Sequence, residues 1–190
     1  FKDTALTSVT IPDSVTSIGN SAFSGAGSLT SVTFGSGLTS IGSDAFRNTA
    51  LTALTIPNSV TSIGSYAFQG LTSLTSLTLG SGITSVGYNS FEGICTSSVN
   101  NLISAELNLA SIPNNLLRYC TQLSSLTLGD LVTSIGSYAF KDTALTSVTI
   151  PDSVTSIDSY AFAGTTSLTS VTFGSGVTSI GSYAFQNSAL

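Results

Sequence analysis

The stretch FKDTALTSVTIPDSVTSI, residues Phe140 to Ile157, also opens the chain at Phe1 to Ile18. The rest of the chain is a series of variations on this unit. The leucines that begin successive copies lie 21 to 23 residues apart, apart from one step of 28: Leu6, Leu29, Leu51, Leu74, Leu102, Leu123, Leu145, Leu168 and Leu190. Self-similarity at such a short period predicts a solenoid of about eight coils, in which neighbouring copies bury one another's apolar faces.

Two kinds of copy alternate along the chain. One carries Ile-Pro-Asp/Asn-Ser after its first apolar segment, at Ile11 to Ser14, Ile56 to Ser59 and Ile150 to Ser153. The other carries Gly-Ser-Gly at Gly35 to Gly37, Gly80 to Gly82 and Gly174 to Gly176. Proline and glycine both end a strand and turn the chain, so each copy has a turn at this point.

Within one copy, polar and apolar residues alternate as in a half-buried strand. Val9 and Ile11 point to one side and Ser8 and Thr10 to the other. A second extended piece follows at Val15 to Ile18, and the short segment that ends at Phe23 is expected to form one helical or 3₁₀ turn. That turn carries the phenylalanine inward. At a strand spacing of ~4.8 Å, the equivalent residues would form a spine: Phe1, Phe23, Phe46, Phe68, Phe91, Leu117, Phe140, Phe162 and Phe185.

The composition limits the possible partners. Lys and Arg total 4 against 9 Asp and Glu, and only 7% of the residues are charged. So few cations cannot neutralise a run of phosphates, which argues against a nucleic-acid partner. The sequence has no apolar run of the ~18 to 20 residues that cross a bilayer and no signal-peptide-like start. We expect residues 1–190 to form a single repeat array that is a fragment of a longer protein, because the sequence starts and stops inside a repeat.

The repeats resemble the BspA-like class of leucine-rich repeats. The resemblance rests on the core IP-x-S-V-T-S-I-G-x-x-A-F, as at Ile56 to Phe68, and covers essentially the whole chain. It implies a right-handed solenoid of the α/β horseshoe class with a parallel sheet on its concave face, and use in large microbial surface proteins that adhere to host or matrix. Family members often have a cysteine three residues after the phenylalanine; here only Cys120, three residues after Leu117, lies in that column.

The pattern breaks at residues 92–122. About six residues are inserted between Glu92 and Asn101, and the next copy is shortened before Ile112. Such a break is either sequence drift or a loop kept for recognition, since loops on rigid scaffolds often carry function. Cys95 and Cys120 fall in nearly the same column of adjacent coils, within reach of a disulfide. The alternative is two buried free thiols that pack as small apolar residues.

The outward positions of the first strands form a ladder of short hydroxyls, in which Glu106 is the single carboxylate. One interpretation is a soluble face that merely favours strand structure. The other is a docking surface for protein or glycan centred on Thr78, Ser104, Glu106, Ser125 and Thr127. Ice binding by a regular threonine array is disfavoured, because leucine-rich solenoids curve and an ice plane needs a flat lattice.

The sequence offers little for catalysis. It has no histidine and no C-x-x-C motif, so acid–base chemistry, catalytic triads and zinc sites lack their usual residues. The Asp/Asn column of Asp3, Asn48, Asp142 and Asn187 is spaced too widely for a calcium site. An enzyme would require a deep pocket around Glu92, Glu106 and Arg118. We predict no catalytic residues, no metal and no cofactor.

A tyrosine column precedes the phenylalanines by two residues, at Tyr66, Tyr138, Tyr160 and Tyr183. It either covers the rim of the core or supports sugar stacking. The sequence therefore predicts a non-enzymatic binding or adhesion domain of a cell-surface or secreted protein, with a protein or glycan ligand, no nucleic acid and no membrane insertion in this segment. The alternative is a structural spacer, or a component that self-associates end to end.

Overall fold

The computed structural model describes residues 1–96 and 98–190, and the chain divides into two compact units, Phe1–Ile94 (unit 1) and Cys95–Leu190 (unit 2). Residue 97 of the predicted insertion lies outside the described residues. The described part contains strands and turns but no helix, and hence no helix long and apolar enough to cross a membrane.

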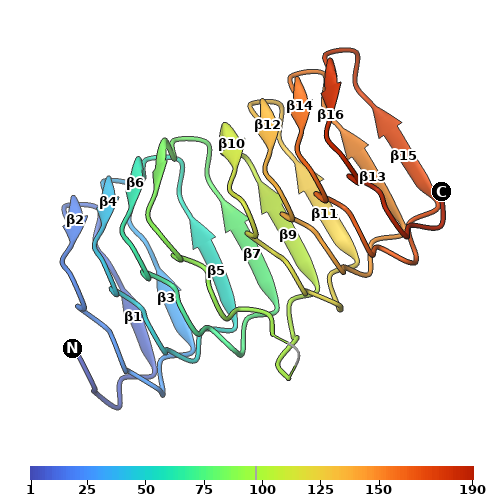
Figure 1. Cartoon of the computed structure of the whole chain (residues 1–190). Helices are drawn as coiled ribbons and strands as arrows, with labels where there is room; N and C mark the ends of the chain where they lie inside the picture. Colours follow the sequence, from blue (N-terminus) through green and yellow to red (C-terminus); the bar gives the residue numbers. More distant parts are fainter. Residues whose placement is uncertain (97) are drawn as a thin grey trace. The chain divides into compact units, whose positions relative to one another are not determined.

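Each unit has four long strands, and each long strand is followed by a short one (Figure 1). In unit 1 the long strands are β1 (Ser8–Thr10), β3 (Ser31–Thr33), β5 (Ala53–Ile56) and β7 (Ser76–Leu79), and the short ones are β2 (Ser17–Ile18), β4 (Ser40–Ile41), β6 (Ser62–Ile63) and β8 (Ser85–Val86). In unit 2 the long strands are β9 (Ser104–Leu107), β11 (Ser125–Leu128), β13 (Ser147–Ile150) and β15 (Ser170–Phe173), and the short ones are β10 (Ser111–Ile112), β12 (Ser134–Ile135), β14 (Ser156–Ile157) and β16 (Ser179–Ile180).

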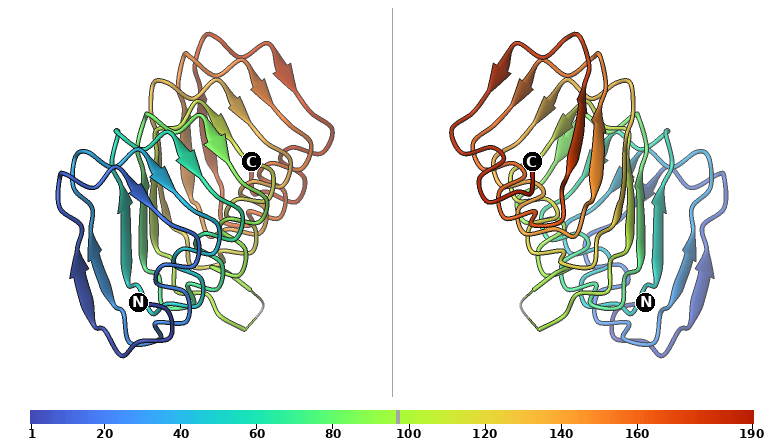
Figure 2. Two further views of the ribbon diagram at one scale, coloured as in Figure 1. Left: turned by 90° about the vertical axis from the view of Figure 1, so that its left-hand side faces the viewer. Right: turned by 90° about the vertical axis from the view of Figure 1, so that its right-hand side faces the viewer.

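All strand pairs are parallel, and they join equivalent residues of neighbouring copies. In unit 1, β1 pairs with β3, β5 pairs with β7, and the short strands form a sheet in the order β2-β4-β6-β8. In unit 2, β9 pairs with β11, β13 pairs with β15, and the short strands follow the order β10-β12-β14-β16. Long and short strands run on opposite sides of each coil (Figure 2). This in-register stacking of repeats confirms the predicted solenoid.

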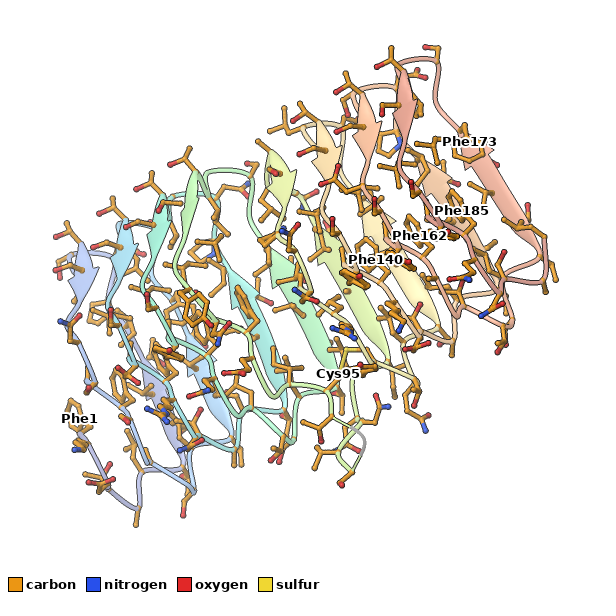
Figure 3. All side chains as sticks on the ribbon, in the orientation of Figure 1. Phe1, Cys95, Phe140, Phe162, Phe173 and Phe185 are labelled. Carbon is orange, nitrogen blue, oxygen red and sulfur yellow. A yellow bond between two sulfur atoms is a disulfide. The ribbon has the colours of Figure 1, made fainter. Side chains whose placement is uncertain are left out.

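The predicted apolar columns form the core of both units. In unit 1 the ring centroids of Phe1, Phe23, Phe46, Phe68 and Phe91 follow one another at 5.0 to 5.5 Å with nearly parallel planes. In unit 2, Phe162 lies 5.1 Å from Phe140 and 5.3 Å from Phe185 (Figure 3). Phe46, Phe68, Phe140 and Phe162 have no exposed surface. Burial of a phenylalanine stabilises the fold by roughly 1.5 to 3 kcal/mol, so each column is a major part of the stability of its unit.

The segment around each phenylalanine is a run of turns rather than the predicted helical or 3₁₀ turn. The residue two before the phenylalanine has a positive φ, as in Ser21 (55°) and Asp44 (56°). The residue two after it also has a positive φ, as in Gly25 (71°) and Asn48 (55°). Left-handed residues interrupt the right-handed backbone that a helix needs. These turns donate their N–H groups to the next coil instead, as from Phe23 to the Ala45 carbonyl at 2.8 Å.

Much of the threonine in the sequence has a structural role. The hydroxyl of the threonine that immediately precedes a strand donates to the backbone carbonyl of the equivalent residue in the preceding coil. Examples are Thr75 to Thr52 (2.9 Å) and Thr39 to Thr16 (2.9 Å) in unit 1, and Thr178 to Thr155 (3.0 Å) in unit 2. These hydroxyls add a side-chain ladder to the backbone ladder, so a high threonine content does not by itself mark a binding face.

The two alternating loop types fit against each other. The Asp13 Oδ1 atom accepts hydrogen bonds from the backbone N–H (2.6 Å) and the hydroxyl (3.0 Å) of Ser36 in the next coil. A Cβ atom on Gly37 would lie 1.9 Å from the Asp13 carbonyl oxygen, so only glycine allows this approach. In unit 2, Asp152 makes the same contacts with Ser175. The alternation in sequence therefore follows from packing between a bulky Pro-Asp-Ser loop and a minimal Gly-Ser-Gly loop.

Candidate functional site

The pair of strands β9 and β11 carries four of the five residues predicted to bind a ligand. Their register places Ser104 beside Ser125 and Glu106 beside Thr127, while Ala105 and Leu107 of the same strand are buried. Glu106 is exposed, and its Oε1 atom accepts a hydrogen bond from the Asn108 side chain at 3.1 Å. The fifth residue, Thr78, lies in β7 of unit 1 beside Thr55 of β5.

Glu106 differs from its neighbours because it is the one ionisable residue at the outward positions of the eight described long strands. Equivalent positions in unit 2 are occupied by Thr127, Thr149 and Thr172. A single acceptor-only group within a field of hydroxyls gives this part of the surface a distinct chemistry. It can accept hydrogen bonds from an incoming donor or attract a cation, whereas the hydroxyls can donate or accept.

No group of three or more His, Cys, Asp or Glu residues among the described residues is placed to hold a metal ion. A groove of about 570 Å³ follows the short strands of unit 1, and its lining consists of Ser, Ile, Gly and Asn without an ionisable side chain: Ser17, Ile18, Gly19, Asn20, Ser40, Ile41, Gly42, Ser43, Ser62, Ile63, Gly64, Ser65, Ser85 and Gly87. Glu92, Glu106 and Arg118 are therefore absent from this groove. Glu92 belongs to unit 1, where it accepts hydrogen bonds from Gln69 (2.5 Å) and Asn89 (3.1 Å).

Hydrogen bonds shift the pKa of two aspartates in the alternating loops. The backbone N–H of Ser36 and then its hydroxyl hold the pKa of Asp13 below its usual value, against a small opposing effect of desolvation. The same two groups of Ser175 lower the pKa of Asp152. Because both donors favour the charged carboxylate, these aspartates serve the packing of the loops rather than proton transfer.

The tyrosines of unit 2 form a stack. The ring centroids of Tyr138 and Tyr160 lie 4.9 Å apart, and those of Tyr160 and Tyr183 lie 5.1 Å apart. All three residues have φ near +60°, a region that bulky residues rarely occupy. In unit 1, Tyr66 and Tyr88 instead meet edge to face at 5.8 Å. The stacked rings cover one another's faces, which leaves their edges and hydroxyl groups for contact with a partner.

Arg118 and Tyr119 extend this aromatic surface, although the sequence pattern alone did not single out Tyr119. The Arg118 guanidinium carbon lies 4.5 Å from the Tyr119 ring centroid and 5.0 Å from that of Tyr138. Its Nη2 atom donates to the Tyr119 hydroxyl at 2.6 Å. The sequence does mark Tyr119 as unusual, because the position two residues after the phenylalanine column is otherwise Gly, Asn or Asp. Tyrosine at a left-handed position is costly and calls for an explanation.

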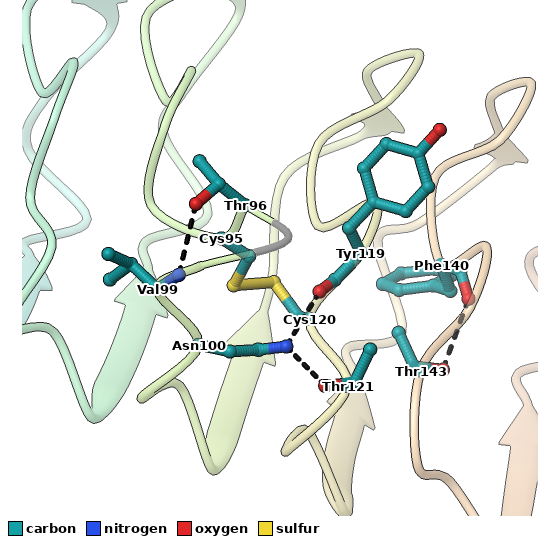
Figure 4. The surroundings of a disulfide bond; sticks show 9 residues. All are labelled: Cys95, Thr96, Val99, Asn100, Tyr119, Cys120, Thr121, Phe140 and Thr143. Atoms are coloured by element: carbon teal, nitrogen blue, oxygen red, sulfur yellow. Dashed lines mark hydrogen bonds between the residues drawn. A yellow bond between two sulfur atoms is a disulfide. The ribbon is translucent and has the colours of Figure 1, made fainter.

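Tyr119 lies in the irregular coil (residues 102–122), and contacts of its own backbone and of Cys120 fix its position (Figure 4). Cys120 forms a disulfide with Cys95, and the Cα atoms of the two cysteines lie 5.0 Å apart. The Asn100 side-chain amide donates to the Tyr119 carbonyl at 3.0 Å and also to the Thr121 hydroxyl. The Tyr119 N–H donates to the Lys141 carbonyl at 2.9 Å. The structure thus contains a disulfide rather than two free thiols. The inserted segment, through Cys95 and Asn100, fixes the backbone that presents Tyr119.

Comparisons with known proteins agree with this architecture. The profile described as "BspA type Leucine rich repeat region" matches residues 1–106 and 95–190, with six copies. A leucine-rich repeat protein from Bacteroides ovatus is 25% identical, with a TM-score of 0.67 over 95% of this chain and 58% of that protein. A leucine-rich cell surface protein from Faecalibacterium prausnitzii is 26% identical, with a TM-score of 0.51 over 96% of this chain and 57% of the other. A leucine-rich repeat protein of T. pallidum shares the fold at 23% identity, with a TM-score of 0.60 over 86% of this chain and 65% of that one.

The chain spans less than two thirds of the length of each of these three proteins. No curated protein matches it significantly. The family profile confirms the resemblance seen in the repeats, and its coverage extends over both units.

Proposed function

Since this chain belongs to the family of BspA-type leucine-rich repeat proteins, we propose that it is a non-enzymatic binding domain of a cell-surface or secreted protein. It recognises a protein or a glycan through the hydroxyl face of its long strands. The Faecalibacterium relative is described as a cell surface protein, which supports this location. The long strands of the described residues expose polar side chains at their outward positions, which supports binding as the activity.

The observation that carries the proposal is the position of Glu106. It lies in register with Thr127, and Ser104 lies in register with Ser125 two residues earlier. The buried residues Ala105 and Leu107 fix the strand beneath them. The paired strands therefore fix the backbone that carries the four outward side chains, so little backbone entropy is lost when a ligand binds. A carboxylate at one point of a hydroxyl ladder gives the ligand an orientation.

The proposal is tested by measuring the binding of this segment to host-matrix proteins and to a glycan array. We expect saturable binding that weakens about tenfold in Glu106→Gln, because a hydrogen bond to a charged group contributes roughly 1.5 to 3 kcal/mol. The matched control is Thr149→Val, which changes the equivalent position of a regular coil of unit 2 and should leave binding unchanged.

Two results would contradict the proposal. One is the absence of saturable binding by a folded segment that sediments as a monomer, which would favour an inert spacer. The other is concentration-dependent self-association without any heterologous ligand, which would favour a self-assembling component.

A further inference from the structure

Two arginines occupy equivalent positions in the two units but face different partners. Arg47 directly follows Phe46 in the core column, and Arg118 directly follows Leu117 in the same column. The Arg47 Nη1 atom forms an ion pair with Asp44 Oδ1 at 3.1 Å. The Arg118 Nη1 atom instead donates to Asn115 Oδ1 at 3.3 Å. The two arginines make the same local contact, but Asp44 supplies a carboxylate and Asn115 an amide. The charge of Arg47 is therefore neutralised by its partner, whereas the charge of Arg118 is not.

Within the part of the chain that the structure describes, no carboxylate pairs with Arg118. The ion pairs there are Arg47–Asp44 and Lys141–Asp142. The Arg118 Nε atom is buried and has no hydrogen-bond partner. Nη1 and Nη2 each donate one hydrogen bond, although a guanidinium has five N–H donors. A partly buried arginine with unused donors and no counter-charge is a site for an anion.

The groups around Arg118 aim its remaining donors. The guanidinium lies over the rings of Tyr119 and Tyr138, at 4.5 and 5.0 Å from their centroids. The rings cover the flat faces of the guanidinium, and Nη1 and Nη2 each keep one N–H that these hydrogen bonds do not use. A carboxylate can accept from both of these N–H groups. The Lys141 Nζ atom also lies 6.0 Å from the Tyr119 centroid, but it forms an ion pair with the Asp142 carboxylate at 3.6 Å. Arg118 is therefore the cation beside Tyr119 that has no counter-charge among the described residues.

The placement of Tyr119 indicates a role beyond packing. Its φ is 68°, and the equivalent residue of the neighbouring coil is Asp142. Although tyrosine is bulky at such a position, 40% of the Tyr119 surface is exposed. The disulfide of Cys120 and the Asn100 amide hold this conformation. A strained residue persists where its surroundings fix it, and such residues cluster at ligand sites. Tyr119 thus presents an aromatic ring and a hydroxyl beside an unpaired arginine.

We propose that Arg118, Tyr119 and Asn115 form a binding site for a carboxylate-bearing sugar of a glycan, such as a sialic or uronic acid. The sugar carboxylate binds the free edge of Arg118. The apolar C–H face of the sugar packs against the exposed part of the Tyr119 ring, and the Tyr119 hydroxyl and the Asn115 amide bind its hydroxyl groups. A sugar fits this set better than an acidic peptide, because it combines one carboxylate with an apolar ring face and several hydroxyls. The inference rests on the proposed binding role but uses a different surface from Glu106.

The decisive variant is Asn115→Asp, which gives Arg118 the same neutralising partner as Arg47. The fold accommodates this change, since Asp44 and Asn115 have φ of 56° and 60° at equivalent positions. The experiment is a titration of the segment with 3′-sialyllactose and with trigalacturonate, followed by two-dimensional NMR. Lactose and methyl-esterified trigalacturonate are the uncharged controls.

We expect at least one of the two acidic sugars to shift the Tyr119 and Arg118 signals in a saturable way. Asn115→Asp and Arg118→Gln should each weaken that binding about tenfold or more, because a charge-assisted pair is lost. The matched control Arg47→Gln should leave it unchanged. Because this site is tested at Asn115 and Arg118 and the proposed function at Glu106, one can fail without the other.

Three results would overturn the proposal. Binding of lactose equal to that of sialyllactose would remove the role of the carboxylate. Unchanged affinity in Asn115→Asp would remove the role of the free arginine. Equal shifts with a tetraglutamate peptide would show that any acidic chain suffices and that the sugar is not recognised.

Discussion

The regular coils of unit 2 and its irregular coil are held by different interactions. In the regular coils, the rings of Phe140, Phe162 and Phe185 stack with centroids 5.1 and 5.3 Å apart. The Asp142 carboxylate packs against Gly164 of the next coil so closely that a Cβ atom on Gly164 would lie 2.0 Å from Asp142 Oδ1. The irregular coil has Leu117 in the phenylalanine column, and a disulfide to Cys95.

The difference lies in where repetition contributes stability and where the repeat pattern is interrupted. In the regular coils of unit 2, none of the described buried side-chain nitrogen or oxygen atoms lacks a hydrogen-bond partner. The irregular coil is tied by a covalent bond and by the Asn100 amide, and Arg118 beside them is left without a counter-charge. Losing the repeat pattern at one coil therefore frees side chains that the pattern would otherwise engage.

The largest effect is expected from removing a ring of the regular column. Phe162→Ala should lower the free energy of unfolding by about 3 to 5 kcal/mol, because the ring is fully buried between two others. Phe162→Leu, which copies the irregular coil, should cost about 1.5 kcal/mol or less. Urea unfolding measures both losses. Equal losses in the two variants would contradict this expectation, because they would mean that the apolar volume of leucine does not replace the ring at residue 162.

A smaller effect is expected at the alternating loops. Gly37→Ala should destabilise the protein by about 1 to 3 kcal/mol, since the new Cβ atom would lie 1.9 Å from the Asp13 carbonyl oxygen. Gly19→Ala is the matched control in the same unit, because a Cβ atom there meets nothing within 4 Å, and it should change stability by no more than about 0.5 kcal/mol. Comparable losses at both glycines would show that the loop contact is not what requires glycine at residue 37.

The smallest expected effect is a dependence of stability on pH. It should come from the loops that carry Asp13 and Asp152 and not from the equivalent loop that carries Asn58. The pKa values of Asp13 and Asp152 are lowered in the folded protein, so the unfolded chain binds protons more readily in acid. Their contribution is present above the ordinary aspartate pKa of about 3.9 and is lost as the pH falls through the lower folded pKa.

Unfolding midpoints measured from pH 7 down to pH 2.5 test this pH dependence. The variant with Asp13→Asn and Asp152→Asn should lose less stability in acid than the natural chain, because an amide does not titrate. Asn58, whose Oδ1 atom accepts from the Ser81 N–H at 2.9 Å, shows that an amide fits this position. Identical acid profiles for the two chains would contradict the assignment.

Most of the fold could be predicted from sequence, because it follows from apolar periodicity. The columns containing Phe46 and Phe162 are visible as a repeat of 22 or 23 residues, and the Ser-Val-Thr segments alternate as half-buried strands do. The left-handed residues beside each phenylalanine were not predicted, since Tyr138 and Tyr160 have no intrinsic preference for a positive φ. Packing between coils, rather than local preference, imposes that conformation.

The candidate sites were predictable in part. Glu106 stood out as the one carboxylate of the hydroxyl ladder. The site that we propose at Arg118 was not predicted, although aligning the copies already sets Asn115 against Asp44. That exchange gains meaning only when Arg47 is seen paired with Asp44 and Arg118 is seen without a carboxylate. The cysteine pairing stayed open because the insertion shifts Cys95 by one position relative to Cys120.

Hydrogen exchange of the backbone amides, measured before and after reduction of the disulfide, tests the central contrast most directly. Reduction should accelerate exchange at Thr96, Tyr119 and Cys120, while the amides of Phe140, Phe162 and strands β13 and β14 keep their protection. Unchanged exchange in the irregular coil after reduction, or a loss of protection that spreads evenly through the regular coils, would contradict it.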